Sequence, residues 1–225
     1  RFNNPFEKND QNVTWKDNLP FSDKYQDIYF QDDAVAEIND VFINPNQLTN
    51  RIKNDSRLHV GELGFGFGLN FFVTLKIWIT NNKNSGIHNL EYLAIDRAFP
   101  SKEQILKTIK NFSELQDVCN IFLQSYDLAH NDTQRIYFPS LKVKLTLIQN
   151  DVELGLKNLI GLKNNEIDAW YLDGFDPSKN KSMWNNSIFQ YIGFLSAKNA
   201  TFGTFTSAGS VSYTHLRAHE TRRYR

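Results

Sequence analysis

The sequence contains only one cysteine, Cys119, and one methionine. A single cysteine excludes an internal disulfide framework and a zinc site built from several cysteines, and it fits a reducing compartment. No apolar run approaches the roughly 20 residues of a membrane-spanning helix, and Arg1 to Asn4 do not have the form of a signal peptide. The histidines show no metal-ligand spacing. We therefore expect a cytoplasmic protein with no metal and no membrane contact.

An excess of charge of one sign is also missing, because lysine plus arginine and aspartate plus glutamate number 25 each. Without a bulk positive field, any nucleic-acid binding must use a local basic patch. By contrast, 40% of the residues are hydrophobic and 14% are aromatic. This composition is typical of a packed globule, and 225 residues suffice for one α/β domain but not for two sizeable ones.

Short apolar runs alternate with helical patterns from residue 58 onward. The runs predict strands at 58–63, 90–96, 141–148, 167–172 and 200–206, and the patterns between them predict helices near 69–78, 102–111, 113–123, 151–162 and 181–196. Because these strands are apolar on both faces, we expect a parallel sheet covered by helices on both sides. Residues 1–56 are polar and aromatic, with short strands predicted at 28–30 and 35–43, and we interpret them as a small β appendage.

The stretch around which the chain is organised runs from Glu62 to Asn70, Glu-Leu-Gly-Phe-Gly-Phe-Gly-Leu-Asn. It follows a strand and precedes a helix, and the alternate glycines Gly64, Gly66 and Gly68 allow a sharp turn against which a ligand can lie. The spacing differs from the Gly-x-Gly-x-x-Gly of dinucleotide folds and is typical of S-adenosylmethionine-dependent methyltransferases. We expect Glu62, the three glycines and Asn70 to bind this cofactor, with Glu62 near its amino-acid end. A glycine turn without a ligand is the alternative.

Acidic residues follow four of the predicted strands: Glu62, Asp96, Asp151 and Asp173. Ligands of parallel sheets lie beyond the carboxyl ends of the strands. Asp96 stands 28 residues after Gly68, a little beyond the roughly 20 residues at which an acid binds ribose hydroxyls in nucleotide folds. Asp151 would accept from an adenine amino group. Taken singly, each acid could instead cap a helix or a turn.

The second informative stretch, 168–184, delivers Asp173 from an apolar strand to the edge of the sheet. Gly174 allows the backbone to turn, and Phe175 with Pro177 forms a stiff apolar rim that could receive a flat ring. A carboxylate that accepts hydrogen bonds from an amine can orient it and take its proton, so we expect Asp173 to be catalytic. The alternative is that Asp173 only caps the turn.

These stretches resemble the tRNA 5-methylaminomethyl-2-thiouridine methyltransferases, namely the MnmC amino-terminal domain and its MnmD-like relatives. The resemblance covers about residues 19–210 and is carried by 26–30, 41–48, 62–70, 168–184 and 204–209. It implies a class I methyltransferase fold, with a Rossmann-like, mostly parallel sheet. It also implies methyl transfer from S-adenosyl-L-methionine to the aminomethyl nitrogen of 5-aminomethyl-2-thiouridine at the tRNA wobble position. Asp173 would lie near that amine, and the substrate-binding residues would be Tyr29, Phe175, Pro177 and Lys179.

Departures from the family pattern occur at three positions and at the end of the chain. Phe67 stands where threonine is usual, Lys181 where proline is usual, and Asp176 where a small residue is usual. We expect residues 1–56 to be the appendage, 57–210 the methyltransferase domain and 211–225 a non-native tail. The last strands of the usual sheet would then be missing, which would leave the strand ending near 206 as an exposed edge.

Three questions remain open from the sequence. Fused members of the family also carry a flavin-dependent oxidase domain, which could be a further domain or a partner of this chain. The chain could be a fragment that binds S-adenosylmethionine without catalysis. Third, the chain could be a nucleotide-cofactor oxidoreductase, although its glycine spacing argues against this hypothesis.

Overall fold

A six-stranded mixed sheet forms the centre of the computed structural model, which describes residues 13–16, 19–23, 27–30, 33–55, 57–82, 89–127, 132–160, 167–174 and 184–205. In spatial order its strands are β6 (Thr133–Phe138), β7 (Val143–Gln149), β5 (Asn89–Asp96), β4 (Arg57–Leu63), β8 (Ile167–Leu172) and β9 (Ser196–Thr204). All neighbours are parallel except β6 and β7, which are antiparallel. The predicted mostly parallel sheet is confirmed, and β6 is a strand that the sequence did not predict.

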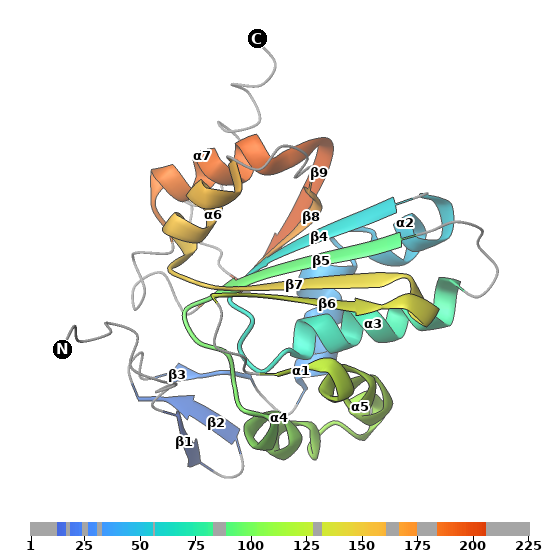
Figure 1. Cartoon of the computed structure of the whole chain (residues 1–225), viewed down its shortest axis with the longest axis vertical. Coiled ribbons are helices and arrows are strands. Elements are labelled where there is room, and N and C mark those ends of the chain that lie inside the picture. The colour runs from blue at the N-terminus through green and yellow to red at the C-terminus, as the bar shows by residue number, and fades with distance from the viewer. Residues whose placement is uncertain are drawn as a thin grey trace.

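Helices cover both faces of this sheet, as Figure 1 shows. On one side lie α6 (Val152–Ile160) and α7 (Asn186–Leu195); on the other lie α3 (Leu69–Asn81), α4 (Lys102–Ile109) and α5 (Gln116–Ser125). Short 3₁₀ turns occur at Ser113–Leu115 and Pro139–Leu141. Strand residues alternate between the two layers: Tyr92 packs with the α3 side and Leu93 with the α6–α7 side. This alternation gives the sheet two hydrophobic cores, one on each face.

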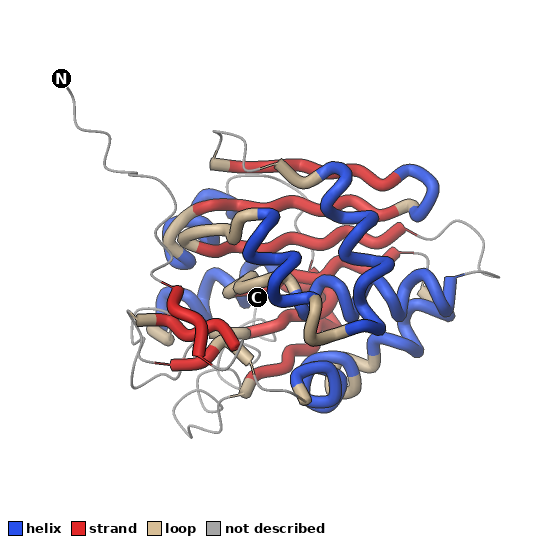
Figure 2. The backbone as a smooth tube through the Cα atoms, turned by 90° about the horizontal axis from the view of Figure 1, so that it is seen from below, coloured by secondary structure: helices blue, strands red, loops and turns tan. Residues whose placement is uncertain are grey.

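The amino-terminal part begins with a separate antiparallel sheet of β1 (Val13–Lys16), β2 (Leu19–Ser22) and β3 (Asp27–Ile28). Figure 2 shows these short strands set apart from the long strands of the main sheet. The strand predicted at 35–43 was wrong, because this segment is helical: α1 (Ala34–Ile38) continues into a π-helix (Asn39–Ile43). Another unpredicted helix, α2 (Leu48–Asn54), follows. The appendage is therefore a small sheet followed by helices that pack on the main domain.

The π-helix packs directly on β9, the last strand of the sheet in the described part of the chain. A Cβ on Gly203 of β9 would lie 2.1 Å from the carbonyl oxygen of Val41, so the two backbones touch. Asn46 donates to the Phe42 and Trp170 carbonyl oxygens and accepts from the hydroxyl of Thr201. The helical segment after β3 is thus fixed to β8 and β9 by contacts that need a glycine and a buried amide.

No helix in the described ranges is long and apolar enough to span a membrane.

Candidate functional site

The glycine turn between β4 and α3 adopts the backbone conformation that only glycine takes readily. Gly64, Gly66 and Gly68 have φ angles of 91°, 53° and 84°. A Cβ on Gly64 would lie 1.8 Å from the carbonyl oxygen of Asp173, and the Gly64 N–H donates to the Ile95 carbonyl at 2.9 Å. The turn is therefore fixed against the ends of β5 and β8, where the sequence predicted the ligand site.

Gly66 is the glycine of this turn with the most room for a side chain. Among the described residues, the nearest atom to a Cβ placed there would be Cδ1 of Tyr29, at 3.6 Å, which is an ordinary van der Waals contact. The Gly66 N–H donates to Oδ2 of Asp96 at 3.0 Å. Burial raises the pKa of Asp96, while backbone N–H groups, that of Gly66 foremost, act to lower it. Asp96 is thus tied to the glycine turn at the end of β5, beside the space in front of Gly66.

A hydrogen-bonded chain of side chains joins the turn to the end of β8. The amide nitrogen Nδ2 of Asn70 donates to Oε1 of Glu62 at 2.8 Å and to Oδ2 of Asp173 at 2.7 Å. The hydroxyl of Tyr92 donates to Oε2 of Glu62 at 2.9 Å. The pairing of Leu63 with Leu172 in parallel strands brings the two carboxylates together, because Glu62 precedes Leu63 in β4 and Asp173 directly follows Leu172 at the end of β8.

Glu62 is fully buried, with 0% of its surface exposed. Burial raises its pKa well above the usual range, and the nearby Asp173 raises it further, while the hydrogen bonds from Asn70 and Tyr92 oppose the change. Both of its oxygens are occupied by Asn70 and Tyr92. Among the described residues, Glu62 is linked to Asp173 through Asn70.

Asp173 is the partly exposed end of the chain of side chains. Burial raises the pKa of its carboxyl to about 7; the hydrogen bond from Asn70 acts to lower it, and the negative charges of Asp96 and Glu37 raise it. A carboxyl that titrates near neutral pH can hold or release a proton under working conditions. Asp173 is the residue that the sequence predicted to be catalytic, and that role stays a prediction.

Asp151 stands at the start of α6 and acts there as a helix cap. Its Oδ1 accepts from the Glu153 N–H at 3.0 Å, and its Oδ2 accepts from Nε of Arg97 at 3.2 Å. The neighbouring Asn150 N–H donates to the Asp96 carbonyl at 2.9 Å, so the start of α6 lies beside the end of β5. The capping role that the sequence left open for Asp151 is present, in a position next to Asp96.

Phe67 and Tyr29 pack against each other on the appendage side of the glycine turn. Their ring centroids are 4.9 Å apart in an edge-to-face arrangement, and Phe67 also contacts Trp15 at 6.0 Å and Phe30 at 6.3 Å. The unusual Phe67 is therefore part of the packing with the small sheet. Tyr29, predicted to bind substrate, lies next to the open position at Gly66.

Three other predicted substrate-binding residues, Phe175, Pro177 and Lys179, lie outside the described residues, as do the departures at 176 and 181. Tyr92 is a site residue that the sequence did not suggest, because an aromatic residue inside a strand is typical of a core. The hydrogen bond from Tyr92 to Glu62 could have been suspected only because a buried carboxylate needs hydrogen-bond donors.

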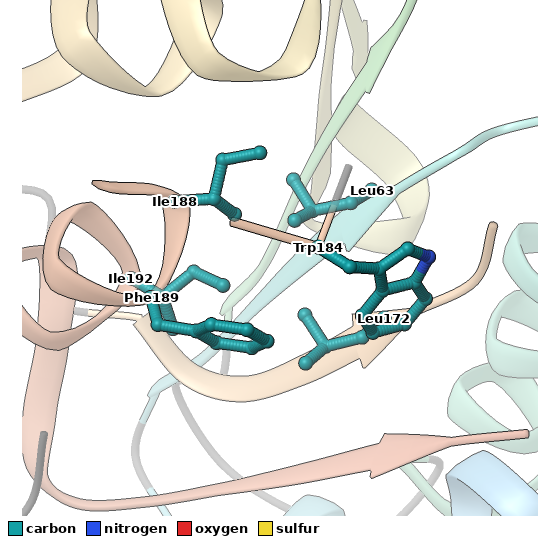
Figure 3. Close-up of a pocket in the computed structure, with 6 residues that line it drawn as sticks. All are labelled: Leu63, Leu172, Trp184, Ile188, Phe189 and Ile192. Atoms are coloured by element: carbon teal, nitrogen blue, oxygen red, sulfur yellow. The ribbon is translucent and has the colours of Figure 1, made fainter. Parts of the chain in front are cut away.

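A small apolar pocket lies on the α7 side of the sheet, as Figure 3 shows. Its volume is about 10 Å³, and it is lined by Leu63, Leu172, Trp184, Ile188, Phe189 and Ile192. This is about the space of one water molecule, and the lining side chains are apolar apart from the indole nitrogen of Trp184. The pocket is a packing gap behind the strand ends. In the described ranges no group of His, Cys, Asp and Glu residues has the arrangement of a metal site.

Comparisons with known proteins show what kind of protein this chain resembles. A family model described as S-adenosyl-L-methionine-dependent methyltransferase matches residues 113–218. The tRNA 5-methylaminomethyl-2-thiouridine biosynthesis bifunctional protein MnmC of Leptospira interrogans serovar copenhageni is 35% identical over 204 residues, which are 88% of this chain and 30% of the relative. MnmC of Legionella pneumophila strain Lens is 32% identical over 222 residues, 91% of this chain and 32% of the relative.

The chain thus spans about a third of the length of the curated relatives it matches. Among solved structures, that of MnmC2 from Aquifex aeolicus superposes with a TM-score of 0.69 at 19% identity, covering 96% of this chain and 65% of the other. At this level of identity the likeness shows the fold.

Proposed function

We propose that this chain methylates the aminomethyl nitrogen of 5-aminomethyl-2-thiouridine at the tRNA wobble position, because residues 113–218 match the model of an S-adenosyl-L-methionine-dependent methyltransferase family and the chain is similar to relatives named MnmC. The observation that carries the proposal is Asp173. Its carboxyl has a pKa raised to about 7 and stands at the end of β8, against the glycine turn. We place the reaction in the cytoplasm.

The residues around the glycine turn fit S-adenosyl-L-methionine. Gly66 has a positive φ and meets no described atom closer than 3.6 Å where a side chain would stand, and its N–H contacts the carboxylate of Asp96. We propose that Gly64, Gly66 and Gly68 provide the backbone surface, that Asp96 binds the ribose hydroxyls and that Asp151 lies near the adenine. When bound, the cofactor supplies an electrophilic methyl group on a sulfonium. Because Glu62 is buried, we assign its contribution to holding Asn70.

The acceptor amine must be neutral before its lone pair can attack. In the proposed mechanism Asp173 uses its Oδ1, since Oδ2 accepts from Asn70, to accept a hydrogen bond from the amine and to take its proton. Burial, and after it the negative charges of Asp96 and Glu37, raise the pKa of Asp173, so that a carboxyl can act as a base near neutral pH. The chemistry assigned to this chain is therefore orientation and deprotonation of the amine.

Two further parts of the proposal concern partners. The substrate is tRNA, held by Tyr29 beside the glycine turn and by Phe175, Pro177 and Lys179. Because the relatives are described as bifunctional and are about three times as long as the match, we also propose that a flavin-dependent oxidase acts next to this activity, as a further domain or a partner.

The test is mass spectrometry of nucleosides after incubation with S-adenosyl-L-methionine and tRNA that carries 5-aminomethyl-2-thiouridine. We expect a gain of one methyl group, lost in the Asp173→Ala protein and kept in an Asp117→Ala protein, whose substituted side chain is exposed on α5. Methylation that survives Asp173→Ala would overturn the role of Asp173. A chain that gains thermal stability with the cofactor but methylates nothing would favour the non-catalytic alternative.

A further inference from the structure

Asn70 occupies the second position of α3, directly after the glycine turn, and its side chain points across the site and not along the helix. It is 4% exposed, and it joins two carboxylates from different strands. A primary amide nitrogen carries two hydrogens, one for each carboxylate, whereas a hydroxyl carries one and an ionised carboxylate carries none. The residue type therefore matches the two acceptors that it contacts.

We propose that Asn70 is a positioning residue for Asp173, held in turn by Glu62 and Tyr92, and that it fixes the Asp173 carboxylate with Oδ1 directed at the acceptor amine. This inference rests on the proposed function for the identity of that amine. It also differs from the role expected from the sequence, in which Asn70 would bind the cofactor.

The geometry favours positioning over cofactor binding. Both hydrogens of Nδ2 are used within the protein, at 2.8 and 2.7 Å. The hydrogen-bonded series of side chains continues from Asn70 through Glu62 to the buried hydroxyl of Tyr92 on β5. Tyr92 therefore fixes Glu62, which in turn fixes the Asn70 amide. Among the residues that the structure describes, Oδ2 of Asp173 has this donor and Oδ1 has none. One carboxylate oxygen is therefore fixed while the other stays available.

The same contact also sets the pH at which Asp173 ionises. After burial, the charges of Asp96 on β5 and Glu37 on α1 raise its pKa. Glu62 on β4, whose own pKa is raised by burial and by Asp173, lies on the other side of Asn70, with the phenol of Tyr92 beyond it. The Asn70 amide stabilises the ionised form against these groups and against burial. Its removal should therefore raise the pKa of Asp173 further. The loss of one hydrogen bond to a charged group shifts the pKa of that group by about one unit.

The experiment compares the wild type with Asn70→Ala and Asn70→Ser proteins. In the pH profile of kcat we expect the acidic limb to move upward by about one pH unit for Asn70→Ala and by less for Asn70→Ser. Calorimetry with S-adenosyl-L-methionine alone should give a Kd within about twofold of the wild type. A large loss of cofactor affinity with an unmoved acidic limb would overturn the inference and assign Asn70 to the cofactor.

A second measurement does not depend on activity. The difference in melting temperature between proteins with and without Asp173→Asn, followed across pH, reports where Asp173 ionises. In the Asn70→Ala background this titration should also move upward by about one pH unit. If it moves while the wild type methylates no tRNA, the proposed function is wrong and the positioning role stands; if it does not move, the positioning role is wrong. Asn70→Ser, which keeps a single donor at this position, is the second variant should Asn70→Ala not fold, and it should move the titration in the same direction by less.

Discussion

Replacing Asp173 by asparagine should abolish methyl transfer and at the same time stabilise the folded chain at neutral and alkaline pH. The pKa of this carboxyl is raised from 3.8 to about 7, chiefly by burial. Below pH 3.8 the group is protonated in both the folded and the unfolded chain. Between pH 3.8 and about pH 7 the carboxyl ionises only in the unfolded chain, so it lowers the stability of the fold increasingly as the pH rises. Above about pH 7 this loss of stability is constant.

The size of the effect follows from the same values. About three pH units correspond to about 4 kcal/mol, reached above pH 7. Because Asp173 is partly exposed, solvent screens the site, and we expect about half of that, near 2 kcal/mol. In a chain of this length such a gain raises the melting temperature by about 4–8 °C. At pH 5 the loss in free energy of unfolding caused by Asp173 is less than half of its full value. The Asn70 amide can still donate to the asparagine oxygen, so the substitution leaves the contact geometry intact.

Melting curves at pH 5 and pH 8 test this reasoning, with an Asp117→Asn protein as the control because Asp117 is exposed on α5. The Asp173→Asn protein should exceed the wild type by a margin that is clearly larger at pH 8, whereas the control should show no such trend. A margin that is equal at both pH values, or one that shrinks at pH 8, would show that Asp173 does not ionise with a raised pKa.

Four further outcomes can be checked on the same chain. Gly64→Ala should lower the free energy of unfolding by at least about 3 kcal/mol in urea titrations, because the new methyl group meets backbone at 1.8 Å in a left-handed conformation. Gly203→Ala should cost about 2–3 kcal/mol in the same assay, since it pushes the π-helix off β9. Phe67→Thr should cost about 3 kcal/mol and make the small sheet more sensitive to protease, because it removes three ring contacts. Cys119 should resist thiol reagents at pH 8 until the chain is unfolded, because burial raises its pKa to about 11.

Strands that are buried on both faces were predictable, and the strand that is buried on one face was not. The run 167–172 is apolar and buried except at Asp168, and it forms β8 as expected. In β6 only Ile136 and Phe138 are buried, and the residues between and before them are polar or exposed. This edge strand pairs antiparallel with β7, where only one face needs to be apolar. A periodicity search tuned to parallel strands passes over such a segment.

The segment 35–43 shows the opposite error. Its valines and isoleucines favour a strand by propensity, yet Ala34, Ile38 and Phe42 are buried at a spacing of four residues, which is helical. The close contact of the π-helix with Gly203 decides the outcome, because a neighbouring glycine lets its backbone pack directly on β9. That contact joins residues about 160 positions apart in the chain, so local sequence does not reveal it.

In the site, the sequence predicted which strands end in acids but not how those acids are joined. The strand-end rule placed Glu62 and Asp173 at one edge of the sheet, and the register of β4 with β8 brings them together. The link through Asn70 depends on two hydrogen bonds, one of which spans 103 positions. Tyr92 is buried as expected of a core aromatic residue, and its hydroxyl is what makes the burial of Glu62 tolerable.

Phe67 explains how the chain can depart from the family pattern inside the glycine turn. Its ring lies against Tyr29 and Trp15, and the Trp15 ring in turn carries the ammonium of Lys107 from α4 at 4.0 Å. The bulky side chain is thus taken up by the small sheet, while the neighbouring Gly66 keeps its positive φ and its bond to Asp96. Because the backbone and not the side chain of this turn faces the open space, the exchange alters the appendage contact and leaves the proposed cofactor surface unchanged.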